Sequence, residues 1–134
     1  MRIDVFSGSI SSEGGAIERT FNRVQFLKSP VGRAAKEEFV NEEWRHYHIE
    51  PEKDFAGTVL FEGERLDRIF LMMRIPSDQA EEWTAELELE RKAKHDAWLR
   101  TELGAPPYTY SWGNVSSEFD AKGCTSDIIV TYAK

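Results

Sequence analysis

The last quarter of the chain, residues 107–132, alternates apolar and polar positions on both sides of a short turn-forming segment. The turn covers residues 120–123, and the alternation that flanks it is typical of strands with one buried face. The pattern therefore predicts an antiparallel hairpin. After its first arm, Gly113 interrupts the alternation, as a glycine does where a strand bulges or another backbone comes close. That arm places three aromatic side chains on one side: Tyr108, Tyr110 and Trp112.

Shorter patterns predict further strands earlier in the chain. Residues 2–6 alternate, and residues 44–49 form an apolar and aromatic run that ends at a proline. Residues 58–61 and 66–73 are predicted to pair as a second hairpin around a Gly-containing turn. The second arm of this hairpin is apolar enough to lie centrally in a sheet.

One long helix is predicted over residues 78–103, with Ser77 as its N-cap and Gly104 as its stop. Its first half is acidic and its second half is mostly basic, which suits the helix dipole. The apolar stripe drifts between the two halves, as expected for a helix that crosses a sheet obliquely. Two short helices are also expected, over residues 20–28 and 33–43.

These elements predict an α+β fold: a mainly antiparallel sheet of about five or six strands, with the long helix packed across one face. At 134 residues, of which 40% are hydrophobic, the chain is expected to form a single domain over residues 1–134. The apolar content excludes intrinsic disorder.

The net charge limits which partners are expected, and the cysteine content limits which cellular compartment is expected. The formal net charge is −7, which has the wrong sign for binding nucleic acid but would attract a basic protein. We expect no membrane association, because the sequence lacks a signal peptide and an apolar run of about 18 residues. The single cysteine, Cys124, cannot form an internal disulfide. A cytoplasmic, soluble protein is expected.

The three histidines are the candidate catalytic or metal-binding residues. His46 and His48 lie two positions apart on an expected strand, so both would point to one face, as metal ligands can. No spacing motif ties His95 to them as a third ligand. The favoured interpretation is a partly exposed pair beside Trp44 and Tyr47. His95 lies in the apolar stripe of the long helix, where a core-edge position is favoured over an acid or base role.

No other group of residues indicates catalysis. Cys124 has no histidine tied to it by spacing, so we do not expect it to be a nucleophile. The acids of the long helix belong to a solvated face, and nothing places two carboxylates across a cleft. These observations favour a protein that is not an enzyme and that uses no cofactor or metal.

Two sets of residues are candidates for binding a protein partner. The acidic half of the long helix could face a basic surface. The aromatic side chains of the last hairpin could provide large contacts, although their packing beneath the helix through Trp83 and Trp98 is the favoured alternative. The candidate residues are Glu81, Glu82, Glu86, Tyr108, Tyr110 and Trp112.

An ordered set of motifs runs through residues 60–132. It consists of F-x-x-x-x-L-x-x-I-x-L from Phe61, H-x-x-W-L-x-x-x-L-G from His95, Y-x-W-G-x-V-x-S-x-x-D up to Asp120 and I-x-V-x-Y from Ile128. The set resembles a group of small bacterial proteins of unassigned activity that includes immunity-type and other accessory proteins. Because these motifs are structural, the resemblance implies a fold more than an activity, and it carries over no catalytic residues.

The sequence therefore favours a non-enzymatic protein-binding module. Its most concrete form is an immunity protein that neutralises a basic toxin domain: the acidic helix would occlude the basic active site, and the aromatic hairpin would supply apolar anchors. The competing class is a small enzyme or a metal- or ligand-binding domain that uses His46, His48 or His95. The sequence leaves the oligomeric state open.

Overall fold

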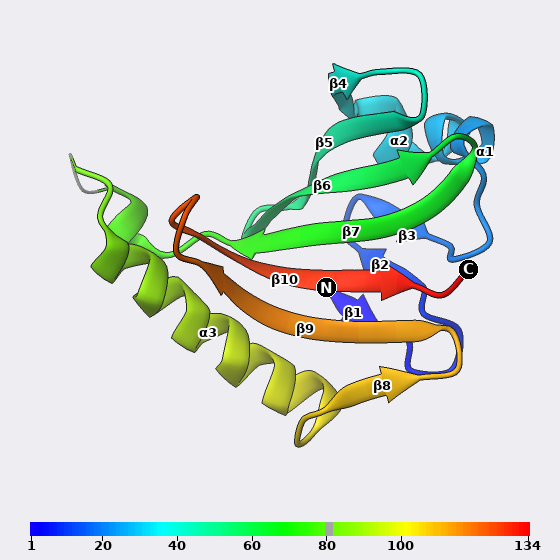
Figure 1. Cartoon of the computed structure of the whole chain (residues 1–134). Helices are drawn as coiled ribbons and strands as arrows, with labels where there is room; N and C mark the ends of the chain where they lie inside the picture. The colour runs from blue at the N-terminus through cyan, green and yellow to red at the C-terminus, as the bar shows by residue number, and fades with distance from the viewer. Residues whose placement is uncertain (80–81) are drawn as a thin grey trace.

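Figure 1 shows the computed structural model of the chain, which describes residues 1–79 and 82–134. The long strands are β4 (Lys36–Val40), β5 (Trp44–Glu52), β6 (Phe55–Glu62), β7 (Arg65–Met73), β9 (Gly113–Asp120) and β10 (Thr125–Tyr132). The short strands are β1 (Arg2–Ile3), β2 (Ile10–Ser12), β3 (Gly15–Ile17) and β8 (Tyr108–Tyr110). The helices are α1 (Arg23–Lys28), α2 (Pro30–Ala34), α3 (Ala85–Leu103) and a short 3₁₀ helix, η1 (Pro76–Gln79).

Within the described residues the strands form two antiparallel sheets. The large sheet has seven strands in the order β4-β5-β6-β7-β10-β9-β8, and the small sheet has the order β1-β2-β3. The α+β class and the antiparallel sheet with one long helix are confirmed. The large sheet exceeds the expected five or six strands for two reasons, since β4 replaces an expected helix and the aromatic run divides into β8 and β9.

The helix expected over residues 33–43 is wrong. Helix α2 begins at Pro30, with Ser29 as its N-cap, and it ends at Ala34. The chain then forms β4, which pairs with β5 at the edge of the sheet. Every residue of β4 is exposed, and Phe39 contacts the His46 ring edge-on instead of pointing into the core. Pairing with β5 therefore outweighs the local helical pattern.

The aromatic run turns back on itself at Ser111–Trp112, so that β8 pairs with β9 as a tight hairpin. Gly113, which follows the turn, has φ of +149°. A Cβ atom there would lie 1.9 Å from the carbonyl oxygen of Thr131 on β10. The close approach of another backbone is thus confirmed, and the local irregularity is a turn, not a bulge.

The long helix starts later than expected. Its N-cap is Thr84, whose Oγ1 accepts a hydrogen bond from the amide of Leu87 at 3.1 Å. Ser77 lies instead in η1, and the next residue, Asp78, folds back to form an ion pair with Arg91 of α3. Helix α1 also starts later, at Arg23, with a capping box between Asn22 and Gln25.

The other strand predictions agree with the structure more closely. Strands β6 and β7 form the expected hairpin, and β7 lies fourth of seven in the large sheet. Strand β5 begins at Trp44 as expected but continues through Pro51 to Glu52. The strand expected over residues 2–6 is shorter, because β1 ends at Ile3.

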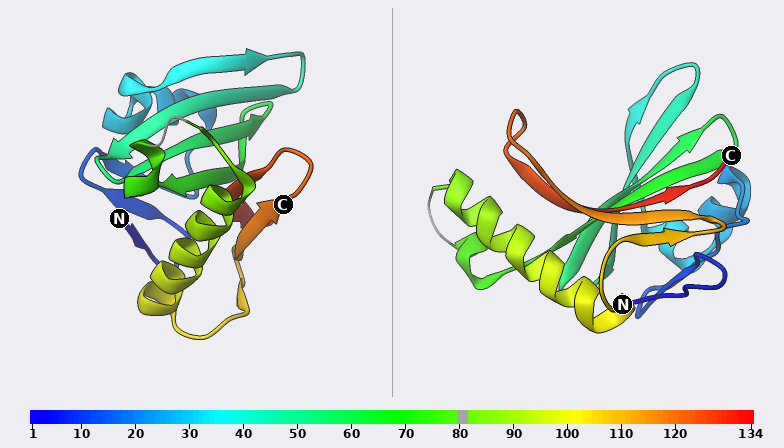
Figure 2. Two further views of the ribbon diagram at one scale, coloured as in Figure 1. Left: turned by 90° about the vertical axis from the view of Figure 1, so that its left-hand side faces the viewer. Right: turned by 60° about the horizontal axis from the view of Figure 1, so that its bottom comes forward.

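All of the helices and the small sheet lie against one face of the large sheet, and Figure 2 shows the other face without any element of the described chain over it. One row of core side chains crosses five neighbouring strands on the covered face: Tyr47, Val59, Ile69, Val130 and Val115. At one end of this face, α1 inserts Phe26 against Tyr47 and Phe61. At the other end, α3 packs through Leu99 and His95, which are both fully buried.

Candidate functional site

A buried polar cluster attaches α3 to the sheet. Arg91 and Glu88 are 2% and 3% exposed, and Arg91 Nε lies 3.1 Å from Glu88 Oε1. The same carboxylate accepts a hydrogen bond from the amide of Ser126 on β10 at 3.0 Å, and Arg91 also pairs with Asp78. Because each charge has a partner, this cluster is suited to holding the helix in place.

His95 belongs to the core and not to its edge. It has no exposed surface, and its Nε2 accepts a hydrogen bond from the amide of Met73 at 3.0 Å. Burial, reinforced by the charge of Arg91, lowers its pKa to about 4, so the ring is neutral at pH 7. A side chain sealed in this way cannot exchange a proton with a bound substrate.

His46 and His48 share a face, as predicted, and this face is the one opposite α3. His46 packs against Phe39 with ring centroids 5.0 Å apart. His48 is half-buried, with Nδ1 3.6 Å from a carboxylate oxygen of Glu38. The sheet separates both residues from His95. Within the described residues, no three His, Cys, Asp or Glu side chains are arranged to hold a metal ion.

Two of the three aromatic residues proposed for partner binding are buried. Tyr108 and Trp112 are 8% and 4% exposed, and Tyr110 stacks on Trp112 with centroids 5.0 Å apart. Trp112 also donates a hydrogen bond from Nε1 to the carbonyl of Val5 and packs on Tyr132. The aromatic group therefore joins the N-terminal segment to the sheet, and its two buried members have little surface to offer a partner.

The acidic residues proposed for partner binding lie near the start of α3. Glu82 and Glu86 are exposed, and together with Glu90 they line a shallow depression. Glu81 lies outside the described residues. Glu88, in contrast, is buried in the cluster with Arg91, so the acidic half of the helix presents fewer free carboxylates than its sequence suggests.

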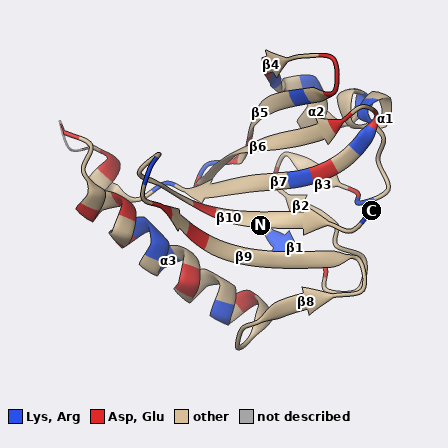
Figure 3. Ribbon diagram, in the orientation of Figure 1, with Lys and Arg blue, Asp and Glu red and all other residues tan. Residues whose placement is uncertain are grey.

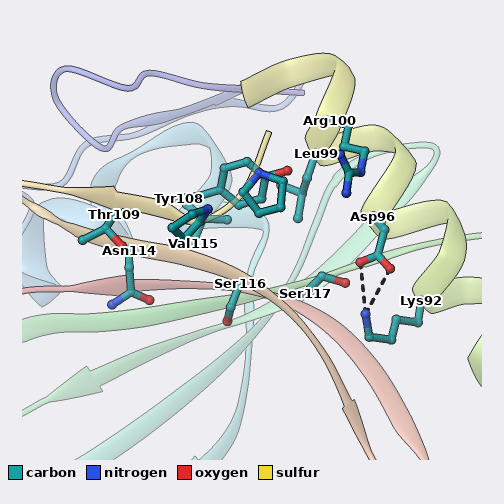
Figure 4. Close-up of a pocket in the computed structure, with 12 residues that line it drawn as sticks. Lys92, Asp96, Leu99, Arg100, Tyr108, Thr109, Asn114, Val115, Ser116 and Ser117 are labelled. Carbon is teal, nitrogen blue, oxygen red and sulfur yellow. Dashed lines mark hydrogen bonds and ion pairs between the residues drawn. The ribbon is translucent and has the colours of Figure 1, made fainter. Parts of the chain in front are cut away.

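A groove of about 490 Å³ lies between α3 and the edge of β9 (Figure 4). Strand β8 pairs only with residues 113–115 of β9, so the next residues of β9, Ser116 and Ser117, line the groove instead. Lys92 and Asp96 form an ion pair at 3.0 Å on its helical wall. Burial opposes the ionisation of Asp96, but the hydrogen bonds and positive charge of Lys92 favour the ionised form, and the pKa of Asp96 is lowered. No histidine or cysteine of the described chain lines the groove.

The uncovered face of the large sheet carries half-buried side chains from four adjacent strands. His48, Thr58, Phe70 and Ile129 are direct cross-strand neighbours. Met72 and Asp127 continue the same face one step along the strands. We call these side chains the open face: His48, Thr58, Phe70, Met72, Asp127 and Ile129. Their apolar members are the kind of surface that a docked protein buries.

Asp127 is the unexpected residue of the open face. It lines a pocket of about 140 Å³ together with His48, Thr58, Phe70 and Met72. Burial, with a further contribution from the charge of Glu88, raises its pKa to about 6. The alternation of β10 places Asp127 beside Ile129, away from buried Ser126 and Ile128, and this signal was available in the sequence.

None of the helices among the described residues combines the length and apolarity needed to cross a membrane. No family model matches the chain, and comparisons with curated proteins and with solved structures return no match.

Proposed function

We propose that the chain is a non-enzymatic protein-binding module whose partner docks on the open face. The observation that carries this proposal is the unequal covering of the large sheet: α1, α2, α3 and the small sheet all lie on one side (Figure 2). On the other side, Phe70, Met72 and Ile129 remain partly exposed in the middle of the sheet. An antiparallel sheet can leave a face to water, but such a face is then usually polar.

A basic protein is the partner that suits this surface. The chain carries a net charge of −7, which favours encounter with a positively charged surface. Acidic residues lie along α3 and at the end of β9, as Figure 3 shows. Glu118 of β9 is the cross-strand neighbour of Asp127, so the acidic character reaches the open face. Neutralisation of a basic toxin domain, as by an immunity protein, is the most concrete form of this function.

The competing enzymatic or metal-binding function has less support from the geometry. It would use His46, His48 or His95, but the first two lie on the opposite side of the sheet from the third. His95 is sealed from solvent and neutral at pH 7. The resemblance of residues 60–132 to immunity-type and accessory proteins also favours the binding function.

The test uses the protein encoded by the gene adjacent to that of this chain. That protein is purified, mixed with the chain and followed by calorimetry, and its toxicity is measured in cells with and without the chain. We expect a stable complex and protection of the cells. Phe70→Glu, which places a charge in the middle of the open face, should weaken binding by about thirtyfold or more.

Val24→Glu is the matched control, because Val24 is an exposed apolar residue on α1, beneath the covered face. It introduces the same charge and should leave affinity unchanged. Ile129→Glu provides a second probe if Phe70→Glu lowers the melting temperature. Binding that is insensitive to both open-face variants would refute the docking site. The docking site for a partner protein would also be refuted if light scattering showed that the chain is a homodimer and that Phe70→Glu dissociates it. A second copy of the chain would then occupy the open face.

A further inference from the structure

The pocket beside Asp127 is the feature of the open face that best identifies a ligand. Strands β5, β6, β7 and β10 all contribute to its lining. Phe70, Met72 and Ala56 form apolar walls, and Asp127 contributes a carboxylate. In the described part of the chain this carboxylate makes neither a hydrogen bond nor an ion pair. A carboxylate in such a setting loses hydration without gaining a partner, which leaves it available for an incoming donor.

The charges around the pocket favour a cation. Glu118 lies directly across from Asp127 on β9, and Asp120 lies further along the same strand. Behind the sheet, Glu88 and Arg91 form an ion pair, and their two charges act on Asp127 in opposite directions. An anion would meet at least three carboxylates here, whereas an ammonium group would gain a charge-assisted hydrogen bond.

The size of the pocket favours a linear side chain over a larger ligand. Its volume is about 140 Å³, and a cavity of about 150 Å³ holds one benzene molecule, or about six heavy atoms. Drug-sized ligands need roughly 300 Å³ or more. The lysine side chain, an ammonium on a four-carbon stem, matches both the volume and the apolar walls.

We propose that this pocket receives a lysine side chain of the basic partner, with the ammonium on Asp127 and the methylene stem along Phe70 and Met72. This inference rests on the proposed function, because it names the anchor by which the partner binds. A central, desolvated anchor that fills a pocket is the usual hot spot of a protein interface.

The proposed ion pair makes binding depend on pH. The pKa of Asp127 is about 6 in the free chain because of burial and the charge of Glu88, and a bound ammonium would lower it. Protonation of Asp127 below pH 6 should therefore weaken binding. His48 lies in the same pocket. Glu118 and Asp120 of β9 add negative charge near the pocket, and Arg91 is held by Glu88 and Asp78.

The test uses n-butylammonium chloride as the probe, since it reproduces the lysine stem and charge without a partner protein. Binding is followed at pH 7.5 through backbone amide chemical shifts of the folded chain. We expect saturable shifts centred on Thr58, Phe70 and Asp127. Asp127→Asn, which preserves shape, should weaken binding by about tenfold or more. Glu13→Gln is the matched control: it removes one carboxylate from the exposed turn between β2 and β3, on the covered side of the large sheet, and should leave binding unchanged.

Three outcomes would overturn the proposal: no saturable shifts, equal binding of the uncharged isostere n-butanol, or affinity unchanged in Asp127→Asn. Tighter binding of n-propylguanidinium than of n-butylammonium would contradict the choice of lysine over arginine. Any of these results leaves the proposed function standing if Phe70→Glu still weakens partner binding by about thirtyfold or more. Conversely, the proposed function is refuted if n-butylammonium binds at Asp127 while Phe70→Glu and Ile129→Glu leave the affinity for the partner protein unchanged.

Discussion

At the scale of single residues, His95 makes the stability of the fold depend on pH. Burial against β7 lowers its pKa to about 4, from an ordinary value of 6.5. Between these two pH values the unfolded chain binds a proton that the folded chain does not. The free energy of unfolding therefore falls as the pH drops through this range, and it recovers above about 6.5.

The prediction is tested by urea unfolding of the chain and of His95→Gln at pH 7.5 and pH 5. Glutamine keeps an acceptor for the Met73 amide but cannot be protonated. We expect the parent chain to lose about 2 kcal/mol more than the variant between the two pH values. Equal losses would show that burial does not hold the imidazole neutral.

Asp127 should reduce the stability of the free chain. Its pKa is raised from 3.8 to about 6, so the ionised carboxylate is less favourable in the folded state than in the unfolded one. The cost develops as the pH rises from about 4 to 6 and is complete above 6. Such a cost is expected where a residue is retained for binding.

Asp127→Asn should accordingly raise the melting temperature at pH 7.5 and change it much less at pH 4, where both states hold the proton. Scanning calorimetry at the two pH values measures this difference, with Glu13→Gln in the exposed turn between β2 and β3 as the control. A lower melting temperature for Asp127→Asn at pH 7.5 would mean that the carboxylate has a stabilising partner, contrary to the structure.

Residue patterns predicted part of the candidate site. The shared face of His46 and His48 followed from strand alternation alone. The alternation of β10 also places Asp127 opposite the core, yet its burial depends on His48 of β5 and Met72 of β7, which are distant in sequence. The burial of Trp112 depends in the same way on Val5, to which it donates a hydrogen bond over 107 positions.

At the scale of elements, local pairings were predictable and distant ones were not. The hairpins β6–β7 and β9–β10 join neighbouring segments through short turns, so alternation and turn residues identify them. The insertion of β10 between β7 and β9 is a long-range pairing that no local pattern encodes. The start of α3 was misplaced because Ser77 and Thr84 are both acceptable N-caps. Asp78, which precedes Thr84 in the chain, forms an ion pair with Arg91 of α3 instead of lying in the first turn of the helix.

Two matched substitutions locate the start of α3. Thr84→Ala should lower the free energy of unfolding by about 1 kcal/mol, because the amide of Leu87 loses its acceptor. Ser77→Ala should have an effect within about 0.5 kcal/mol, since the N-cap of α3 is Thr84 and not Ser77. Chemical denaturation of both variants measures the difference. The opposite order of effects would place the helix start at Ser77.

At the scale of the whole molecule, contacts between distant segments tie the chain into one unit. The hydroxyl of Tyr132 donates to the carbonyl of Gly8 at 2.7 Å, and the amino group of Met1 lies 2.9 Å from a carboxylate oxygen of Glu52. Helix α3 contacts both β1 and the large sheet. The small sheet therefore shares a core with the large one, and a single domain over residues 1–134 stays a prediction.

A chain organised in this way should unfold in one cooperative step. Tryptophan fluorescence reports on distant parts of the structure, through Trp44 in β5, Trp98 in α3 and Trp112 beside the N-terminal segment. Far-ultraviolet circular dichroism reports on the sheet and the helices together. We expect the two urea transitions to coincide, with a slope of about 1–3 kcal/mol per molar urea.

If the fluorescence of Trp112→Phe, which retains the other tryptophans, showed an earlier transition than circular dichroism, part of the structure would be unfolding separately. The open face would then belong to one of two units, and its rigidity as a docking surface would no longer follow from the stability of the whole chain.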